Sequence, residues 1–362
     1  MTTEADILAA LRNVKTPSGA PLTVDGAVSG LTLSGSKVFV SITGDPAHGA
    51  AWESVRQAAV EAIERTPGVE RAIVTLTAER GPAPAAKSAA VGGAPAPAAL
   101  EHVRFIVAVG SGKGGVGKST TAANLALGLA AQNWRVGLLD ADIYGPSAPR
   151  LLGISGKPQV EGGKLVPMEA HGVKVMSIGF LIDEETPMIW RGPMVAQALT
   201  QLLGEVVWGE LDALVVDMPP GTGDVQLTLS QKVPLSGAII VSTPQDLALV
   251  DARRAIAMFR KVNAPVLGVI ENMSYFLCPH CGERTDIFSH GGARRDAERL
   301  GAPFLGEIPL DAVIRETADE GRPVVSSAPQ GPHAAIYLGL AAKVKALLER
   351  QGRNAPTPLS AP

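Results

Sequence analysis

The stretch VRFIVAVGSGKGGVGKS, residues 103–119, decides the fold of the larger part of this chain. An apolar run typical of a buried strand ends at Gly110, and a glycine-rich loop follows before a helix begins after Gly117. The string GKGGVGKS, residues 112–119, matches the phosphate-binding pattern G-x-x-x-x-G-K-[ST]. Backbone N–H groups can converge on phosphate oxygens there because side chains are absent, and the helix N-terminus favours an anion. The stretch therefore predicts a nucleotide-binding site on an α/β domain.

The loop pattern also predicts roles for single residues. Lys118 is expected to pair with the β- and γ-phosphates, and Ser119 is expected to ligate Mg²⁺. The whole phosphate-contacting set is Gly112, Lys113, Gly114, Gly115, Val116, Gly117, Lys118 and Ser119.

Three aspartates at strand ends would complete such a site. Asp217 closes the apolar run LDALVVD and precedes MPPGTGD, which is the position of a Walker-B carboxylate near Mg²⁺. Asp140 and Asp142 end LLDAD, the strand that follows the loop helix. Either of these two could position the attacking water or act as its base.

The remainder of this part alternates strand and helix, which predicts a mostly parallel sheet with crossover helices. The expected strands are 103–110, 135–142, 211–218, 237–244, 264–272 and 303–308. The expected helices are 118–132, 194–207, 247–262, 311–320 and 333–350.

Residues 81–100 divide the chain, because a segment so rich in Ala, Pro and Gly cannot bury enough apolar surface to offset its ordering entropy. Before it, residues 1–80 read as a small α+β domain of order α-β-β-α-β, with strands at 22–33, 37–43 and 69–76. After it, residues 101–351 form the nucleotide-binding domain, and residues 352–362 are expected to be a disordered tail.

Composition excludes several classes of protein. Aromatic residues are 4% of the chain, which argues against a stacking platform for single-stranded nucleic acid. The net charge of −3 provides no field that would attract nucleic acid or an anionic membrane. No apolar run is long enough to span a bilayer, and the N-terminus lacks a basic signal-peptide region. We expect a cytoplasmic protein that binds neither nucleic acid nor membrane.

The two cysteines, Cys278 and Cys281, lie together in CPHCG. Two thiolates cannot complete a tetrahedral four-sulfur site within one chain. Four interpretations stay open on these residues alone. They are a cluster bridging two copies, a zinc site that adds His280 or His290, a redox dithiol, and a structural pair. The redox interpretation is weakened because a thioredoxin-type CxxC opens a helix after the first strand of its own fold.

The motifs together resemble a known group. Lys113, an extra lysine early in GKGGVGKST, is similar to the deviant Walker A loop of the ParA/MinD class of ATPases. The chain over residues 101–350 further resembles the Mrp/ApbC-type iron–sulfur cluster carrier ATPases. This second likeness rests on DADIYGPS at 140–147, IWRGPM at 189–194, DMPPGTGD at 217–224 and ENMSYFLCPHCG at 271–282. Residues 1–80 resemble the small domain that precedes many such ATPases, with TPSG in place of the usual Asp-Pro turn and no cysteine.

The resemblance implies a P-loop NTPase fold and a homodimer in which Lys113 reaches the partner's phosphates. It implies that Asp142 assists water attack, Asp140 and Asp217 support Mg²⁺, and Asn272 reads the adenine base. It also favours a [4Fe–4S] cluster bridging the dimer through Cys278 and Cys281. We then expect a slow ATP hydrolase that passes clusters between a scaffold and apo iron–sulfur proteins.

Three alternatives remain for the function. A ParA/MinD-like positioning ATPase would need a basic or amphipathic surface for its membrane or DNA track, and it would not need CPHCG. A nitrogenase-reductase-like electron donor uses two widely separated cysteines, unlike this pair. A zinc-stapled regulatory ATPase would hold zinc in place of the cluster.

Overall fold

The computed structural model describes residues 3–354 except for 25–26, 35–36, 45–48, 70, 79–97, 182–194, 196–197 and 200–201. The chain forms two compact units, Met1–Gly92 and Gly93–Pro362. The predicted linker lies almost wholly outside the described residues, as do IWRGPM and residues 355–362.

An eight-stranded sheet organises the larger unit, in the order β15-β12-β11-β4-β10-β5-β9-β8. All neighbouring pairs are parallel except β8 with β9. The strands are β4 (Val103–Gly110), β5 (Val136–Asp140), β8 (Met168–Ala170), β9 (Val173–Ser177), β10 (Leu211–Asp217), β11 (Gly237–Ser242), β12 (Val266–Glu271) and β15 (Phe304–Glu307). The mostly parallel P-loop fold expected from the sequence is confirmed.

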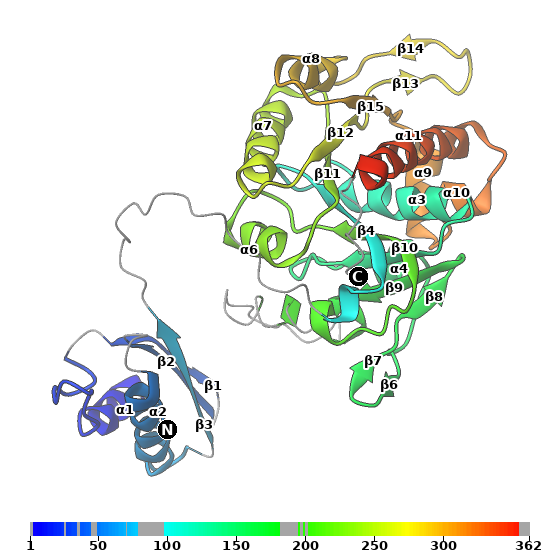
Figure 1. Ribbon diagram of the computed structural model, residues 1–362. Helices are drawn as coiled ribbons and strands as arrows, with labels where there is room; N and C mark the ends of the chain where they lie inside the picture. The colour runs from blue at the N-terminus through cyan, green and yellow to red at the C-terminus, as the bar shows by residue number, and fades with distance from the viewer. Residues whose placement is uncertain are drawn as a thin grey trace, which may run out of the picture. The chain divides into compact units, whose positions relative to one another are not determined.

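Helices cover both faces of this sheet, as a parallel sheet requires. Figure 1 shows α3, α10 and α11 on one side, with α6 and α7 on the other. The helices are α3 (Lys118–Ala130), α4 (Ala148–Leu151), α6 (Asp224–Lys232), α7 (Asp246–Lys261), α8 (Gly292–Arg299), α9 (Ala312–Asp319), α10 (Val324–Ser327) and α11 (Pro332–Asn354), with short 3₁₀ turns at Ala98–Leu100 and Ile178–Phe180. No helix in the described part of the chain combines the length and apolar character that crossing a bilayer requires.

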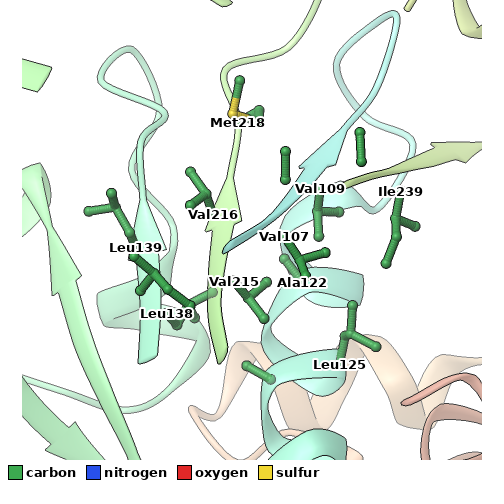
Figure 2. Packing of buried hydrophobic residues seen from close by; sticks show 14 of the residues in the cluster. Val107, Val109, Ala122, Leu125, Leu138, Leu139, Val215, Val216, Met218 and Ile239 are labelled. Carbon is green, nitrogen blue, oxygen red and sulfur yellow. The ribbon is translucent and has the colours of Figure 1, made fainter. Parts of the chain in front are cut away.

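The core lies where β4, β5 and β10 meet the loop helix α3. Figure 2 shows Val107, Val215 and Leu138 on these strands, close to Ala122 and Leu125 of α3. All five side chains are at most 2% exposed. Burying a Val or Leu side chain contributes about 1.5–3 kcal/mol, so this packing fixes the strand end from which the phosphate loop leaves.

Two small hairpins extend from the larger unit. One pairs β6 (Val160–Glu161) with β7 (Lys164–Leu165), and the other pairs β13 (Phe276–Leu277) with β14 (Arg284–Thr285). The second hairpin carries both cysteines between its strands.

The smaller unit has the predicted order α-β-β-α-β. It contains α1 (Glu4–Leu11), β1 (Val28–Ser34), β2 (Lys37–Gly44), α2 (Gly49–Glu64) and β3 (Arg71–Ala78). Strand β2 pairs antiparallel with β1 and parallel with β3. Thr3 and Asp6 form the capping box that starts α1.

Element boundaries differ from the sequence-based expectations at several points. The first small-domain strand begins at Val28 and not at 22, because residues 14–22 close on themselves through the Leu22 N–H bond to Val14 O. Helix α11 continues to Asn354, beyond the expected start of the tail at 352. The helix expected at 194–207 falls partly outside the described residues. The short elements α4, α6, α8 and α10, the two hairpins and the strands β8 and β9 were not predicted.

Candidate functional site

The phosphate loop joins the centre of the sheet to helix α3, and its lysine already has a partner. Lys118 and Asp217 are both buried, and the Lys118 ammonium donates to Asp217 Oδ1. The same ammonium lies 3.3 Å from Ser119 Oγ. In a buried position each charge needs the other, so a phosphate entering the loop would compete with Asp217 for Lys118. Ser119 and Asp217, the residues expected at Mg²⁺, therefore both contact this lysine.

Both ends of the loop are held by close packing. A Cβ on Gly112 would lie 2.1 Å from the backbone carbonyl carbon of Asp251 in α7. A Cβ on Gly117, which has φ +79°, would lie 2.1 Å from Asn272 Nδ2. Between them Gly114 has open space around its Cβ position. The glycines at the two ends of the loop are thus required by neighbours in other elements.

Asp140 organises the turn after β5. Its Oδ2 accepts from Ser147 N at 2.8 Å, Ala148 N at 2.9 Å and Ser177 Oγ at 3.1 Å, and its Oδ1 accepts from Asp142 N at 3.1 Å. Burial, with Asp217 nearby, raises the pKa of Asp140 to about 7. The bonds favour a carboxylate that supports the loop carrying Asp142 over one that contacts a metal ion directly.

Asp142 lies in the same buried region as Lys118. Its Oδ1 accepts from Gly145 N at 3.3 Å. Burial raises the pKa of Asp142 and Asp217 adds to this, while Lys118 opposes it. The fold thus brings the three predicted aspartates, Asp140, Asp142 and Asp217, to the carboxyl ends of the adjacent strands β5 and β10.

The segment after Asp217 is tied to the start of the loop. Gly221 donates its N–H to Ser111 O at 3.1 Å, and Ser111 Oγ donates to Lys113 O at 2.9 Å. Lys113 itself is half-buried in the loop. A conformational change in residues 218–223 would therefore act directly on the start of the phosphate loop.

Asn272, expected at the adenine base, holds the loop itself in this structure. Its Nδ2 donates to Val116 O at 2.8 Å, and its backbone N–H donates to Ser242 O at 2.8 Å. The residue is buried at the end of β12. The interaction with the backbone of the phosphate loop is a role that the sequence did not predict.

Cys278 and Cys281 occupy the exposed turn of the β13–β14 hairpin. Cys278 N–H donates to Glu283 O at 2.9 Å, and Gly282 N–H donates back to Cys278 O at 2.8 Å. Hydrogen bonds from the backbone at Cys281 and His280 lower the pKa of the Cys278 thiol. Neither cysteine forms a disulfide, and Cys281 is exposed. The hairpin thus holds two free cysteine sulfurs in one turn.

The expected histidine ligands do not complete a site within one chain. Among the described residues, no group of three or more His, Cys, Asp or Glu side chains could hold a metal ion. His290 Nε2 instead lies 3.1 Å from Glu307 Oε2. Within the described part of the chain, neither His280 nor His290 forms a three-ligand group with the two sulfurs.

Sequence reasoning missed two buried polar residues, Glu271 and Gln226. Glu271, adjacent to Asn272, accepts bonds from the segment that follows the cysteines. Gln226 in α6 is 1% exposed, and within the described residues its amide has no hydrogen-bond partner. In the sequence, only the position of Glu271 at a strand end, and that of Gln226 just after PPGTGD, could have indicated that these residues matter.

Comparison with known proteins assigns the family. Residues 102–345 match the family described as NUBPL iron-transfer P-loop NTPase. The chain belongs to this family. Residues 4–75 match a second family, described as iron-sulfur cluster assembly protein, although this small domain contains no cysteine.

Curated relatives are identical to this family member at about half of the aligned positions. It is 57% identical to the iron-sulfur cluster carrier protein of Pseudomonas fragi, over 67% of this chain and 85% of the relative. It is 51% identical to that of Escherichia coli strain K12, over 72% and 71%. It is 53% identical to the iron-sulfur cluster transfer protein NUBPL of Mus musculus, over 70% and 80%.

Solved structures confirm the fold. An Archaeoglobus fulgidus nucleotide-binding protein in complex with ADP is 44% identical, with a TM-score of 0.57 over 65% of this chain and 91% of that one. The cell division ATPase MinD of Pyrococcus furiosus is 22% identical, with a TM-score of 0.51 over 67% and 99%. The ParA/MinD-like fold and the recognition of an iron-transfer P-loop NTPase are therefore confirmed.

Proposed function

We propose that this protein binds iron–sulfur clusters and transfers them to apoproteins, with ATP binding and hydrolysis coupled to cluster handling. One observation carries the proposal. A complete phosphate loop and an exposed, incomplete pair of cysteine ligands occupy the same domain of an iron-transfer P-loop NTPase. The names of the relatives that cover most of this domain agree with it.

For ATP hydrolysis we assign water as the nucleophile, attacking the γ-phosphorus while the bond to the ADP oxygen breaks. Lys118 and Lys113 neutralise phosphate charge, and Asp142 orients the water. Ser119 and Asp217 would hold Mg²⁺, which supplies charge neutralisation at the phosphates, and Asp140 fixes the turn that carries Asp142. The oxygen atoms present suit Mg²⁺, a hard cation that prefers oxygen ligands. We expect slow turnover, well below ~10 s⁻¹ in the absence of a partner.

For the cargo we assign one [4Fe–4S] cluster to two copies of the chain. Cys278 and Cys281 from each copy would give four thiolates. Leu277 and Ile287, on the same segment, are 45% and 51% exposed, and a second copy would cover them. A cluster held in this way depends on the geometry of the dimer, so its release can respond to nucleotide state.

The proposal is tested by anaerobic reconstitution with iron and sulfide, followed by the visible absorption spectrum, iron content and mass in solution. The unaltered chain should hold four irons per dimer. Cys281→Ala should lose cluster loading and keep ADP binding. His280→Ala, in the same turn, is the matched control and should load a full cluster. A full cluster in Cys281→Ala, or zinc in place of iron in protein purified anaerobically, would contradict the assignment.

A further inference from the structure

Two consecutive residues at the end of β12 contact the two functional parts of the domain. Asn272 contacts the phosphate loop, and Glu271 contacts the segment that carries the cysteines. Glu271 is fully buried, and nothing in the hydrolysis or cluster assignment uses it.

The Asn272 contact fixes a phosphate-binding donor. Asn272 Nδ2 donates to Val116 O, and this carbonyl belongs to the same peptide group as the N–H of Gly117. In a planar trans peptide the C=O and N–H point in opposite directions. Asn272 therefore orients the Gly117 N–H, a loop donor of the kind that binds phosphate. A phosphate accepting this N–H would polarise the peptide and strengthen the bond to Asn272.

The Glu271 contacts close the base of the cysteine-bearing segment, residues 273–291. Its Oε1 accepts from Ser274 Oγ at 2.6 Å, near the start of the segment, and from Gly291 N at 2.9 Å, at its end. Its Oε2 accepts from Ala293 N at 2.7 Å, in the first turn of α8. One carboxylate thus holds together the chain entering and leaving the cysteine hairpin.

Other hydrogen bonds that hold this segment to the domain also lie near its two ends, including one from Arg295 Nη1 to His290 O at 3.1 Å. Ser274 N donates to Ile308 O at 3.0 Å, Leu310 N donates to Tyr275 O at 2.7 Å, and His290 contacts Glu307. From residue 279 to 287 every residue is exposed. The position of the two sulfurs is therefore set mainly at the base of the segment, where Glu271 lies.

We propose that Glu271 is a positioning residue that couples the phosphate loop to the cysteine segment through its neighbour Asn272. Nucleotide bound in the loop strengthens the hydrogen bond from Asn272 to Val116 O. The backbone that joins Asn272 to Glu271 transmits this change to the carboxylate that closes the segment. The inference rests on the proposed function, because it explains how nucleotide state would reach the cluster ligands.

The test is hydrogen exchange on the full chain, with and without ADP and Mg²⁺ and with a non-hydrolysable ATP analogue. In the unaltered chain, nucleotide should slow exchange in the loop peptides, and it should slow exchange at 273–293 by at least about threefold. In Glu271→Gln an amide NH₂ group replaces one carboxylate oxygen, so it meets a backbone N–H donor that the oxygen had accepted from. Loop protection and nucleotide affinity should stay within about threefold, and the response at 273–293 should disappear. Asp296→Asn is a matched acid-to-amide control in α8, and it should respond like the unaltered chain.

The outcomes separate this inference from the proposed function. A merely structural role for Glu271 would raise exchange equally with and without nucleotide, leaving the ratio between the two states unchanged, and that result overturns the inference. Loop protection without any response at 273–293 in the unaltered chain also overturns it and leaves the proposed function intact. Absence of loop protection with either nucleotide overturns both. Should Glu271→Gln not fold, Ser274→Ala removes one donor only and must reduce the response. A full response in that variant overturns the inference.

Discussion

The phosphate loop and the cysteine hairpin differ in how closely the rest of the domain packs around them. The loop leaves the central strand β4, and its lysine pairs with a buried aspartate. Other elements pack against it at both ends. The hairpin has strands of two residues, an exposed turn and two sulfurs. The phosphate loop is thus held in place by other elements of the same chain, whereas the two sulfurs lie in a turn that the domain leaves exposed.

The largest expected effect removes the charge at the loop. Lys118→Ala should lower ATP hydrolysis by about 10³-fold, because the phosphates lose their buried cation. Phosphate release at saturating ATP measures this. The rate of Cys278 alkylation in nucleotide-free protein should stay within about twofold, because the coupling proposed above requires bound nucleotide. Hydrolysis within tenfold of the unaltered chain would show that the loop is not the catalytic site.

The next largest expected effect is a loss of stability when the close packing at one end of the phosphate loop is disturbed. Gly112→Ala places a methyl group against the Asp251 backbone, which cannot move aside as a side-chain end could, so we expect a loss of about 1–3 kcal/mol in stability. Gly114→Ala has open space around its Cβ position and should change stability by less than about 0.5 kcal/mol. Chemical denaturation measures both. Equal effects would mean that the close approach at Gly112 is not a constraint.

Substitution of Asp140 tests whether the hydrogen bonds that its carboxylate accepts stabilise the turn after β5. Asp140→Asn presents a donor to at least one backbone N–H group and should cost about 1–3 kcal/mol. Its pKa is raised from 3.8 to about 7 by burial and by Asp217. The folded chain therefore keeps a proton that the unfolded chain has lost, and the stability contributed by this group falls as pH rises from 3.8 to about 7.

The cost of Asp140→Asn should accordingly be larger at pH 5 than at pH 8, measured by denaturation of nucleotide-free protein. A pH-independent cost would show that Asp140 is already ionised at the lower pH. Asp296→Asn, at a half-buried carboxylate that pairs with Arg253 and Arg299, provides the control for a general effect of removing a carboxylate.

The smallest effect concerns the hairpin. The pKa of Cys278 is lowered by backbone hydrogen bonds, so its reactive thiolate persists to lower pH. In metal-free protein, iodoacetamide should modify Cys278 several-fold faster than Cys281 near pH 7, and the preference should shrink as pH rises. Peptide mass spectrometry over a pH series measures this. Faster modification of Cys281 at every pH would show that exposure, and not thiolate character, controls reactivity.

The sequence predicted the parts of the molecule that repeat a strong local pattern. The apolar strands, the loop and the carboxylates at strand ends follow from alternation and spacing, because parallel strands bring their carboxyl ends to one edge. It did not predict that Asn272 contacts Val116 or that Glu271 closes the cysteine segment. Those contacts depend on pairing between β11 and β12 and on the path of the chain back to α8, neither of which has a local signature.

The central place of β4 has a consequence for biosynthesis. The strand that leads into the loop is the first of its sheet to be made, and its two neighbours are β10 and β11. Val103 pairs with Leu211, and Val107 pairs with both Val215 and Gly237. A nascent chain that has already emerged through Ser119 therefore lacks both lateral supports of its own strand and the aspartate that neutralises Lys118. Such non-local pairing slows folding. A ribosome-bound chain that ends before β10 should be unable to retain ATP, even though every residue of the loop has been synthesised.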